Sequence, residues 1–158
     1  MLMEKTAKMS HRVDAALPDV VDEVMREAYG KAIRPNGRIN LSAVPTHADV
    51  TKEVMTGRLR AAGLESNHGM PKYVQKLLGI AEPGVQDTVP PLILPMPTHR
   101  GTGQSFHNIL YGLIPRETRV GALTEAQILD RLRQAYDKFG WSEVFPVVQE
   151  WYHVVQVL

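Results

Sequence analysis

Apolar residues recur at helical spacing in the first half of the chain, and turn residues separate these stretches. PDVVDEVMREAY at 18–29 predicts a helix with proline in its first turn, and Gly30 stands where helices often end. The segment THAD at 46–49 has the form of a capping box, with Asp at the position that Glu usually takes. It predicts a helix to about Ala62 that Gly63 closes.

The second half contains three further segments with helical spacing. KYVQKLLG at 72–79 follows a proline and predicts a short helix, and FHNILYGLI at 106–114 predicts another. Thr124 opens a second capping box, which predicts a helix to Phe139 that Gly140 ends. Ser142 is the expected cap of the last helix.

Extended structure is expected at two places only. PPLILPM is a compact apolar run between prolines, too short for a helix, and predicts a buried strand over Leu92–Met96. Leu64–Asn67 is the other strand candidate. The pattern therefore predicts an α+β fold that is mostly helical, with a small extended element in the middle.

Composition adds limits on the class of protein. The chain has 158 residues, 44% of them apolar, which suits one domain with a sizeable core. It has no cysteine, which excludes disulfides, thiolate metal sites and a cysteine nucleophile. No apolar run approaches the roughly 20 residues that cross a bilayer, so no membrane partner is expected. MLMEKTAKMSHR has no apolar core typical of a secretory leader, so export would need another route.

Charge is balanced over the whole chain but biased locally. There are 18 Lys and Arg against 17 Asp and Glu, so no global basic field indicates a nucleic-acid partner. Residues 51–80 have a basic excess, with two acidic residues against five basic ones: Lys52, Arg58, Arg60, Lys72 and Lys76. This stretch is either a solvated helix face or a mild phosphate-facing patch.

Two polar segments concentrate the candidate chemistry. ESNHGMP at 65–71 holds a carboxylate, an amide and an imidazole, and THRGTGQSFHN at 98–108 holds two imidazoles and a guanidinium around a glycine-rich turn. An imidazole can take a proton from water near neutral pH, and oxygen and nitrogen ligands can hold a divalent cation. Together these groups would suffice to hydrolyse a phosphodiester, whereas singly each fits an ordinary loop residue.

These two segments carry a resemblance to a known family. NHGMPKYVQKLLGI and PPLILPMPTHRGTGQSFHNILY resemble the HNH/endonuclease VII superfamily of ββα-metal nucleases, above all its divergent members in bacterial polymorphic toxins. The resemblance covers about 50 residues, 64–113. It implies a catalytic core there, a short hairpin plus a helix, within a single domain 1–158 whose flanking helices lie in 14–63 and 124–158.

The resemblance also implies roles for individual residues. His68 takes the place of the general base, and Asn67 stands where the family usually has His or Asp as a metal ligand. An amide oxygen is the poorer ligand, so Glu65 becomes a credible substitute. His99 and His107 are expected to complete the metal site.

The resemblance also implies which residues contact the substrate. Arg100 would bind phosphate through its planar fork, and Lys72 would contact the substrate as well. Tyr111, one turn after His107, would orient that histidine or contact the substrate.

The resemblance implies a setting as well as an activity. The expected cofactor is a divalent ion, Mg, Mn or Zn, and the expected substrate is nucleic acid, DNA before RNA. The protein would be the C-terminal domain of a bacterial toxin or effector, delivered into a target cell without a cleavable signal peptide and otherwise cytoplasmic. An immunity protein is the implied partner.

Two other functions stay open. The chain could be a non-enzymatic helical interaction or regulatory domain, and then no pair among His68, His99 and His107 should lie within about 5 Å. It could also be a metal-independent ribonuclease, with His68 and His99 as an acid/base pair on RNA.

The remaining histidines and aromatic residues have simpler interpretations. His47 fits a structural position at a helix start, and His153 fits a packed or edge position on the last helix. The C-terminal aromatic residues predict a helical core stripe, with a base-stacking platform or a partner-binding face as alternatives; they are Trp141, Phe145, Trp151 and Tyr152.

Overall fold

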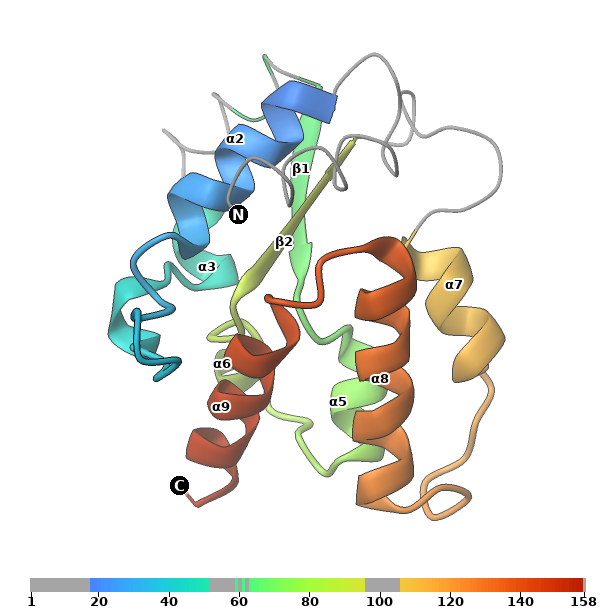
Figure 1. Cartoon of the computed structure of the whole chain (residues 1–158). Helices are drawn as coiled ribbons and strands as arrows, with labels where there is room; N and C mark the ends of the chain where they lie inside the picture. Colours follow the sequence, from blue (N-terminus) through green and yellow to red (C-terminus); the bar gives the residue numbers. More distant parts are fainter. Residues whose placement is uncertain (1–17, 52–58, 60, 62, 96–105, 158) are drawn as a thin grey trace.

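The computed structural model describes residues 18–51, 59, 61, 63–95 and 106–157, and it shows the mostly helical α+β fold that the sequence predicts (Figure 1). The elements are α2 (Pro18–Tyr29), η1 (Leu41–Ala43), α3 (His47–Val50), β1 (Leu64–His68), α5 (Lys72–Leu77), α6 (Pro83–Gln86), β2 (Pro91–Pro95), α7 (Phe106–Leu113), α8 (Glu125–Phe139) and α9 (Phe145–Gln156). Within these ranges no helix combines the length and the apolar character needed to cross a bilayer.

The two predicted strands form an antiparallel pair, with Leu64 opposite Pro95 and His68 opposite Pro91. From Leu92 to Leu94, every side chain of β2 is buried; α2 packs against this strand, and α3 contacts both strands (Figure 1). Burial on both faces explains why the strand is a continuous apolar run rather than an alternating one. The chain between the strands forms α5 and α6, so the pair is not a tight hairpin.

Helix ends agree with the sequence at two capping boxes. Thr124 and Gln127 exchange side chain–backbone hydrogen bonds at the start of α8, and Gly140 ends that helix with a left-handed φ of 97°. Thr46 and Asp49 do the same at α3. α3 ends at Val50 with Thr51 as its C-cap, so this helix is shorter than the one predicted to reach Ala62. Most of the remaining predicted stretch lies outside the described residues.

The start of the last helix differs from the prediction. Ser142 is not its cap; residues 142–144 form a turn, and α9 begins at Phe145. Pro146 explains the difference. A helix capped by Ser142 would place this proline four positions inside, where a backbone N–H is required. With the later start, Pro146 falls in the first turn, where its missing N–H costs nothing.

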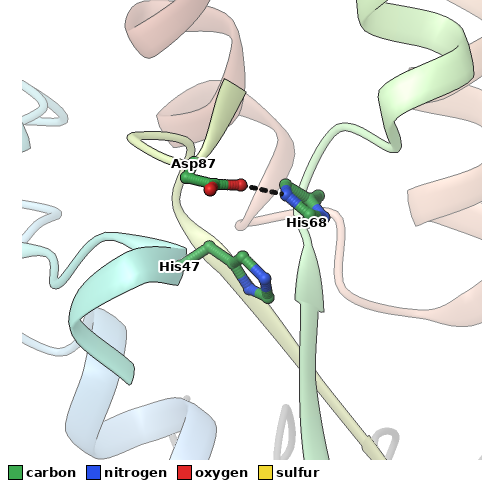
Figure 2. Close-up of side chains that lie close together, drawn as sticks. All are labelled: His47, His68 and Asp87. Carbon is green, nitrogen blue, oxygen red and sulfur yellow. Dashed lines mark hydrogen bonds and ion pairs between the residues drawn. The ribbon is translucent and has the colours of Figure 1, made fainter. Parts of the chain in front are cut away.

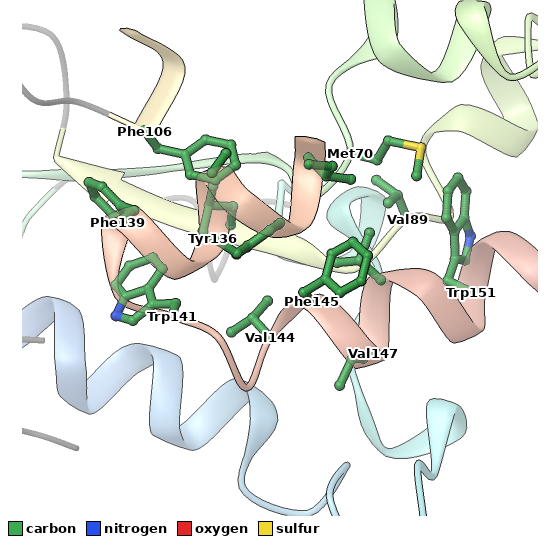
Figure 3. Packing of buried hydrophobic residues seen from close by; sticks show 14 of the residues in the cluster. Met70, Val89, Phe106, Tyr136, Phe139, Trp141, Val144, Phe145, Val147 and Trp151 are labelled. Carbon is green, nitrogen blue, oxygen red and sulfur yellow. The ribbon is translucent and has the colours of Figure 1, made fainter. Parts of the chain in front are cut away.

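The core lies between the sheet and the C-terminal helices (Figure 3). α8 buries a helical stripe that includes Leu132, Tyr136 and Phe139. The four C-terminal aromatic side chains are all buried, which confirms their interpretation as core residues: Trp141, Phe145, Trp151 and Tyr152.

Polar tips of buried aromatic residues connect distant parts of the chain. The Trp151 indole N–H donates to Thr88 Oγ1 at 2.9 Å, and Tyr29 OH donates to the Pro91 carbonyl. Tyr136 OH donates to the Gly69 carbonyl at 2.5 Å. Buried hydroxyl and indole groups usually find such partners, and here the acceptors lie at the ends of the strands or next to them.

Gly69 is required by a close backbone approach. Its N–H donates to the Pro90 carbonyl at 2.8 Å, and a Cβ at this position would lie 2.5 Å from the same oxygen. No side chain can therefore be added directly after His68 without moving the backbone.

Gly69→Ala is expected to destabilise the protein by about 1–3 kcal/mol, because the added methyl group overpacks a backbone oxygen and a Val148 methyl group. Gly112→Ala is the matched control. It lies in α7, its Cβ would meet nothing within 4 Å, and alanine should be neutral or stabilise the helix by up to about 1 kcal/mol. Urea unfolding of both variants measures the difference, and equal stability would contradict the packing argument.

Candidate active site

Three side chains from separate elements meet at one end of the sheet (Figure 2). His47 is the first residue of α3, His68 is the last residue of β1, and Asp87 directly follows α6. One ligand atom from each, a ring nitrogen or a carboxylate oxygen, lies within 4.8 Å of the other two. In the part of the chain that the structure describes, these residues form a group with the composition of a metal site.

Backbone hydrogen bonds hold the three residues in place. The N–H of His47 donates to the Val89 carbonyl at 2.7 Å, and the N–H of Ala48 donates to the Asp87 carbonyl at 3.0 Å. The first amides of α3 are thus satisfied by the segment that carries Asp87. Pairing of His68 with Pro91 fixes the third residue.

His68 and Asp87 form a directed hydrogen bond of 2.8 Å between Nε2 and Oδ1. This bond lowers the pKa of the Asp87 carboxyl below its usual value and outweighs the opposing effect of burial. The carboxylate is therefore ionised at neutral pH and can only accept, so His68 Nε2 carries the donated hydrogen. In the neutral ring, the lone pair then belongs to Nδ1, the atom that could take a proton.

His47 is held as a neutral imidazole. Its Nδ1 lies 2.9 Å from Ser66 Oγ, and its ring centroid lies 4.0 Å from that of His68. Burial, followed by repulsion from His68, lowers the pKa of His47 to about 4, although the charge of Asp87 partly opposes the shift. At physiological pH the His47 ring is thus uncharged, and its Nδ1 is hydrogen-bonded to Ser66 Oγ.

A cavity of about 600 Å³ adjoins this cluster, and His68 is part of its wall. Its charged lining residues are basic, and no Asp or Glu of the described chain lines it. The other lining residues are Asn67, Pro71, Lys72, Tyr73, Lys76, Ala81, Pro83, Gln86, His107, Tyr111 and Arg116. His68 therefore contacts the carboxylate of Asp87 and also lines a cavity whose charged residues are basic.

The residues singled out in the sequence fall into three groups. His68, Lys72 and Tyr111 line the cavity, together with Asn67 and His107. Glu65 lies on β1 and belongs neither to the cavity wall nor to the three-residue cluster.

The remaining two, His99 and Arg100, lie outside the described residues. The guanidinium that the structure does place at the cavity belongs to Arg116.

Sequence reasoning missed His47 and Asp87. The capping box explains why a helix starts at His47, but the ring of this residue also contacts His68, which goes beyond the structural role expected from its position. Asp87 lies in a loop-like segment with no motif of its own. His47 is 19 positions from Ser66, to which it is hydrogen-bonded, and Asp87 is 19 positions from His68, so no local pattern could have indicated these contacts. His153, by contrast, is exposed on α9.

The depressed pKa of His47 predicts a pH dependence of stability. In the unfolded chain this histidine titrates near the ordinary value of about 6.5, whereas the folded value is about 4. Between these values the unfolded state binds more protons, so the free energy of unfolding should fall as the pH is lowered from about 6.5 to about 4. His47→Gln should flatten this dependence. Urea unfolding midpoints between pH 7 and pH 4.5 measure this dependence. Equal slopes of midpoint against pH for the wild type and for His47→Gln would refute the lowered pKa of His47.

Comparison with protein-family models, curated proteins and solved structures finds no match for this chain. The side chains of the cluster and of the cavity are therefore the basis on which a function can be argued.

Proposed function

We propose that this protein is a metal-dependent nuclease, a hydrolase of phosphodiester bonds, with His47, His68 and Asp87 as ligands of a divalent cation. One observation carries the proposal. The ligand atoms of these residues lie within 4.8 Å of one another, and His68 also lines a cavity whose charged side chains are basic. A cation and a phosphate could therefore meet at His68.

The donor set suits a catalytic cation. Two imidazoles and a carboxylate resemble the three-ligand sets that leave a coordination position open for water or substrate. Metal binding needs neutral imidazole with a free lone pair and ionised carboxylate. The lowered pKa values of His47 and Asp87 favour these states at neutral pH. A cation bound by both His68 and Asp87 would therefore replace the hydrogen that His68 Nε2 shares with Asp87. The side chain of Asp87 is 42% exposed, so the cluster is open to solvent.

The surrounding residues supply what phosphodiester hydrolysis further requires. A bound divalent cation would act as a Lewis acid and would lower the pKa of a coordinated water. Lys72, Lys76 and Arg116 of the cavity wall would neutralise phosphate oxygens, the arginine with its planar fork.

The resemblance of residues 64–113 to HNH/endonuclease VII nucleases supports nucleic acid as the substrate, DNA before RNA. It also supports a bacterial toxin or effector as the setting, delivered without a cleavable signal peptide and controlled by an immunity protein. In this proposal His68 is a ligand, whereas the family resemblance alone makes it the general base.

A second candidate function rests on the hydrogen bond between His68 and Asp87. A carboxylate that orients an imidazole prepares it as a proton acceptor, and the 2.8 Å bond has this form. His68 would then take the proton of a ribose 2′-hydroxyl without any cation. This metal-independent ribonuclease would spare DNA, which lacks that hydroxyl.

Cleavage assays with plasmid DNA and with RNA separate these functions. We expect cleavage with Mg²⁺, Mn²⁺ or Zn²⁺, loss of cleavage in chelator, and recovery when the cation is restored. RNA cleavage that persists in chelator, with DNA intact, would favour the second candidate. Intact DNA and RNA under every condition would overturn both and leave the non-enzymatic interaction domain.

Substitutions test the ligand set. His47→Gln, His68→Ala and Asp87→Asn should each lower activity by about 100-fold or more. Each should also weaken cation binding, measured by titration calorimetry. His153→Gln replaces an exposed histidine of α9 and should retain full activity. If His47→Gln remains fully active while His68→Ala does not, His68 acts as a base and the three-ligand site is wrong.

A further inference from the structure

The cavity beside His68 has a basic side that the proposed cation does not use. Lys72 and Lys76 are four residues apart on α5 and therefore lie on the same face of this helix. Arg116 adds a third cationic side chain. None of these three has an ion pair with a carboxylate among the described residues. Three cationic side chains without carboxylate partners thus surround one cavity. This arrangement indicates an anionic ligand.

A second side of the cavity is aromatic and held in place. The Tyr73 and Tyr111 ring centroids are 5.7 Å apart, and Tyr73 OH donates to the Ile114 carbonyl at 2.7 Å. The Arg116 guanidinium carbon lies 5.5 Å from the centroid of the Tyr111 ring. The guanidinium thus lies over the Tyr111 ring, and the two groups together form a surface on which a flat heterocycle can stack.

The cations and the aromatic platform together fit one nucleotide. The volume of about 600 Å³ lies within the range of small-molecule sites, about 300–1,000 Å³. A base inside a duplex is stacked between its neighbours and cannot enter such a hollow, whereas an unpaired base can. A cavity of this size would therefore favour a single strand over a duplex.

We propose that this cavity binds one unpaired nucleotide, with its phosphate at Lys72 and Lys76 and its base against Tyr111, so that the preferred substrate is single-stranded nucleic acid. The inference rests on the proposed function, because His68 in the cavity wall would then face the adjoining phosphodiester.

Binding in chelator tests this inference separately from cleavage. The probes are labelled single strands of DNA and of 2′-O-methyl RNA, which lacks a free 2′-hydroxyl, and the matching duplexes. Fluorescence anisotropy should show at least tenfold tighter binding of the single strands. Equal or tighter binding of the duplexes would overturn the preference.

The variants distinguish the phosphate contacts from the stacking contact. Removal of both lysines in Lys72→Ala/Lys76→Ala should reduce the slope of log Kobs against log salt by about 0.7, since the two lysines neutralise one phosphate and each neutralised phosphate of a single strand contributes about 0.7. Tyr111→Ala should weaken binding about 5-fold to 100-fold without changing this slope. Tyr111→Phe keeps the ring and should bind as the wild type does. Lys138→Ala, on the exposed surface of α8, is the matched control.

The outcomes separate the two proposals. If the lysine and tyrosine variants behave as expected but no probe is ever cleaved with cation present, the nucleotide site stands and the nuclease function fails. If cleavage requires the cation while Lys72→Ala/Lys76→Ala and Tyr111→Ala bind like the wild type, the nuclease stands and the nucleotide site is wrong. The melting temperature of each variant should lie near the wild-type value. This control shows that a loss of binding does not result from unfolding.

Discussion

The backbone contact between Gly69 and Pro90 is the constraint on which the candidate site depends. It joins the residue after β1 to the residue before β2, so the two strands close at the point where His68 ends the first of them. Tyr136 of α8 fixes the Gly69 carbonyl, and the first amides of α3 bind the carbonyls of Asp87 and Val89. The cluster is thus positioned mainly by main-chain hydrogen bonds, and side-chain packing secures them.

Electrostatics divide the site into two parts. Two imidazoles with ring centroids 4.0 Å apart cannot readily both carry charge, and burial keeps His47 neutral. Asp87 supplies the negative charge on one flank of His68, while the cavity on another flank has only positive charges among its described lining residues. In the proposed function, this arrangement would attract a cation and an anion to neighbouring positions without bringing Asp87 and the anion into direct repulsion.

Local patterns in the sequence were sufficient for much of the fold. A capping box predicted α8 and an apolar run predicted β2, while Leu64–Asn67 was a strand candidate that the structure confirms as β1. The histidine motif singled out His68, whose role stays a prediction. The start of α9 was missed because a proline inside the segment outweighed the capping preference of Ser142. His47 and Asp87 could not be assigned, since their contacts with the strand depend on how loops dock and not on spacing along the chain. Arg116 likewise reaches the cavity from beyond the end of α7, outside any recognisable motif.

The bond between the Trp151 indole and Thr88 gives the molecule an intrinsic optical reporter. Thr88 is the immediate neighbour of Asp87, so a shift of this carboxylate alters the surroundings of a buried indole. The other tryptophan, Trp141, packs against Phe139 in the core. Occupancy of the cluster can therefore be followed through the emission of Trp151, with no dye attached, and a Trp141→Phe background isolates its fluorescence.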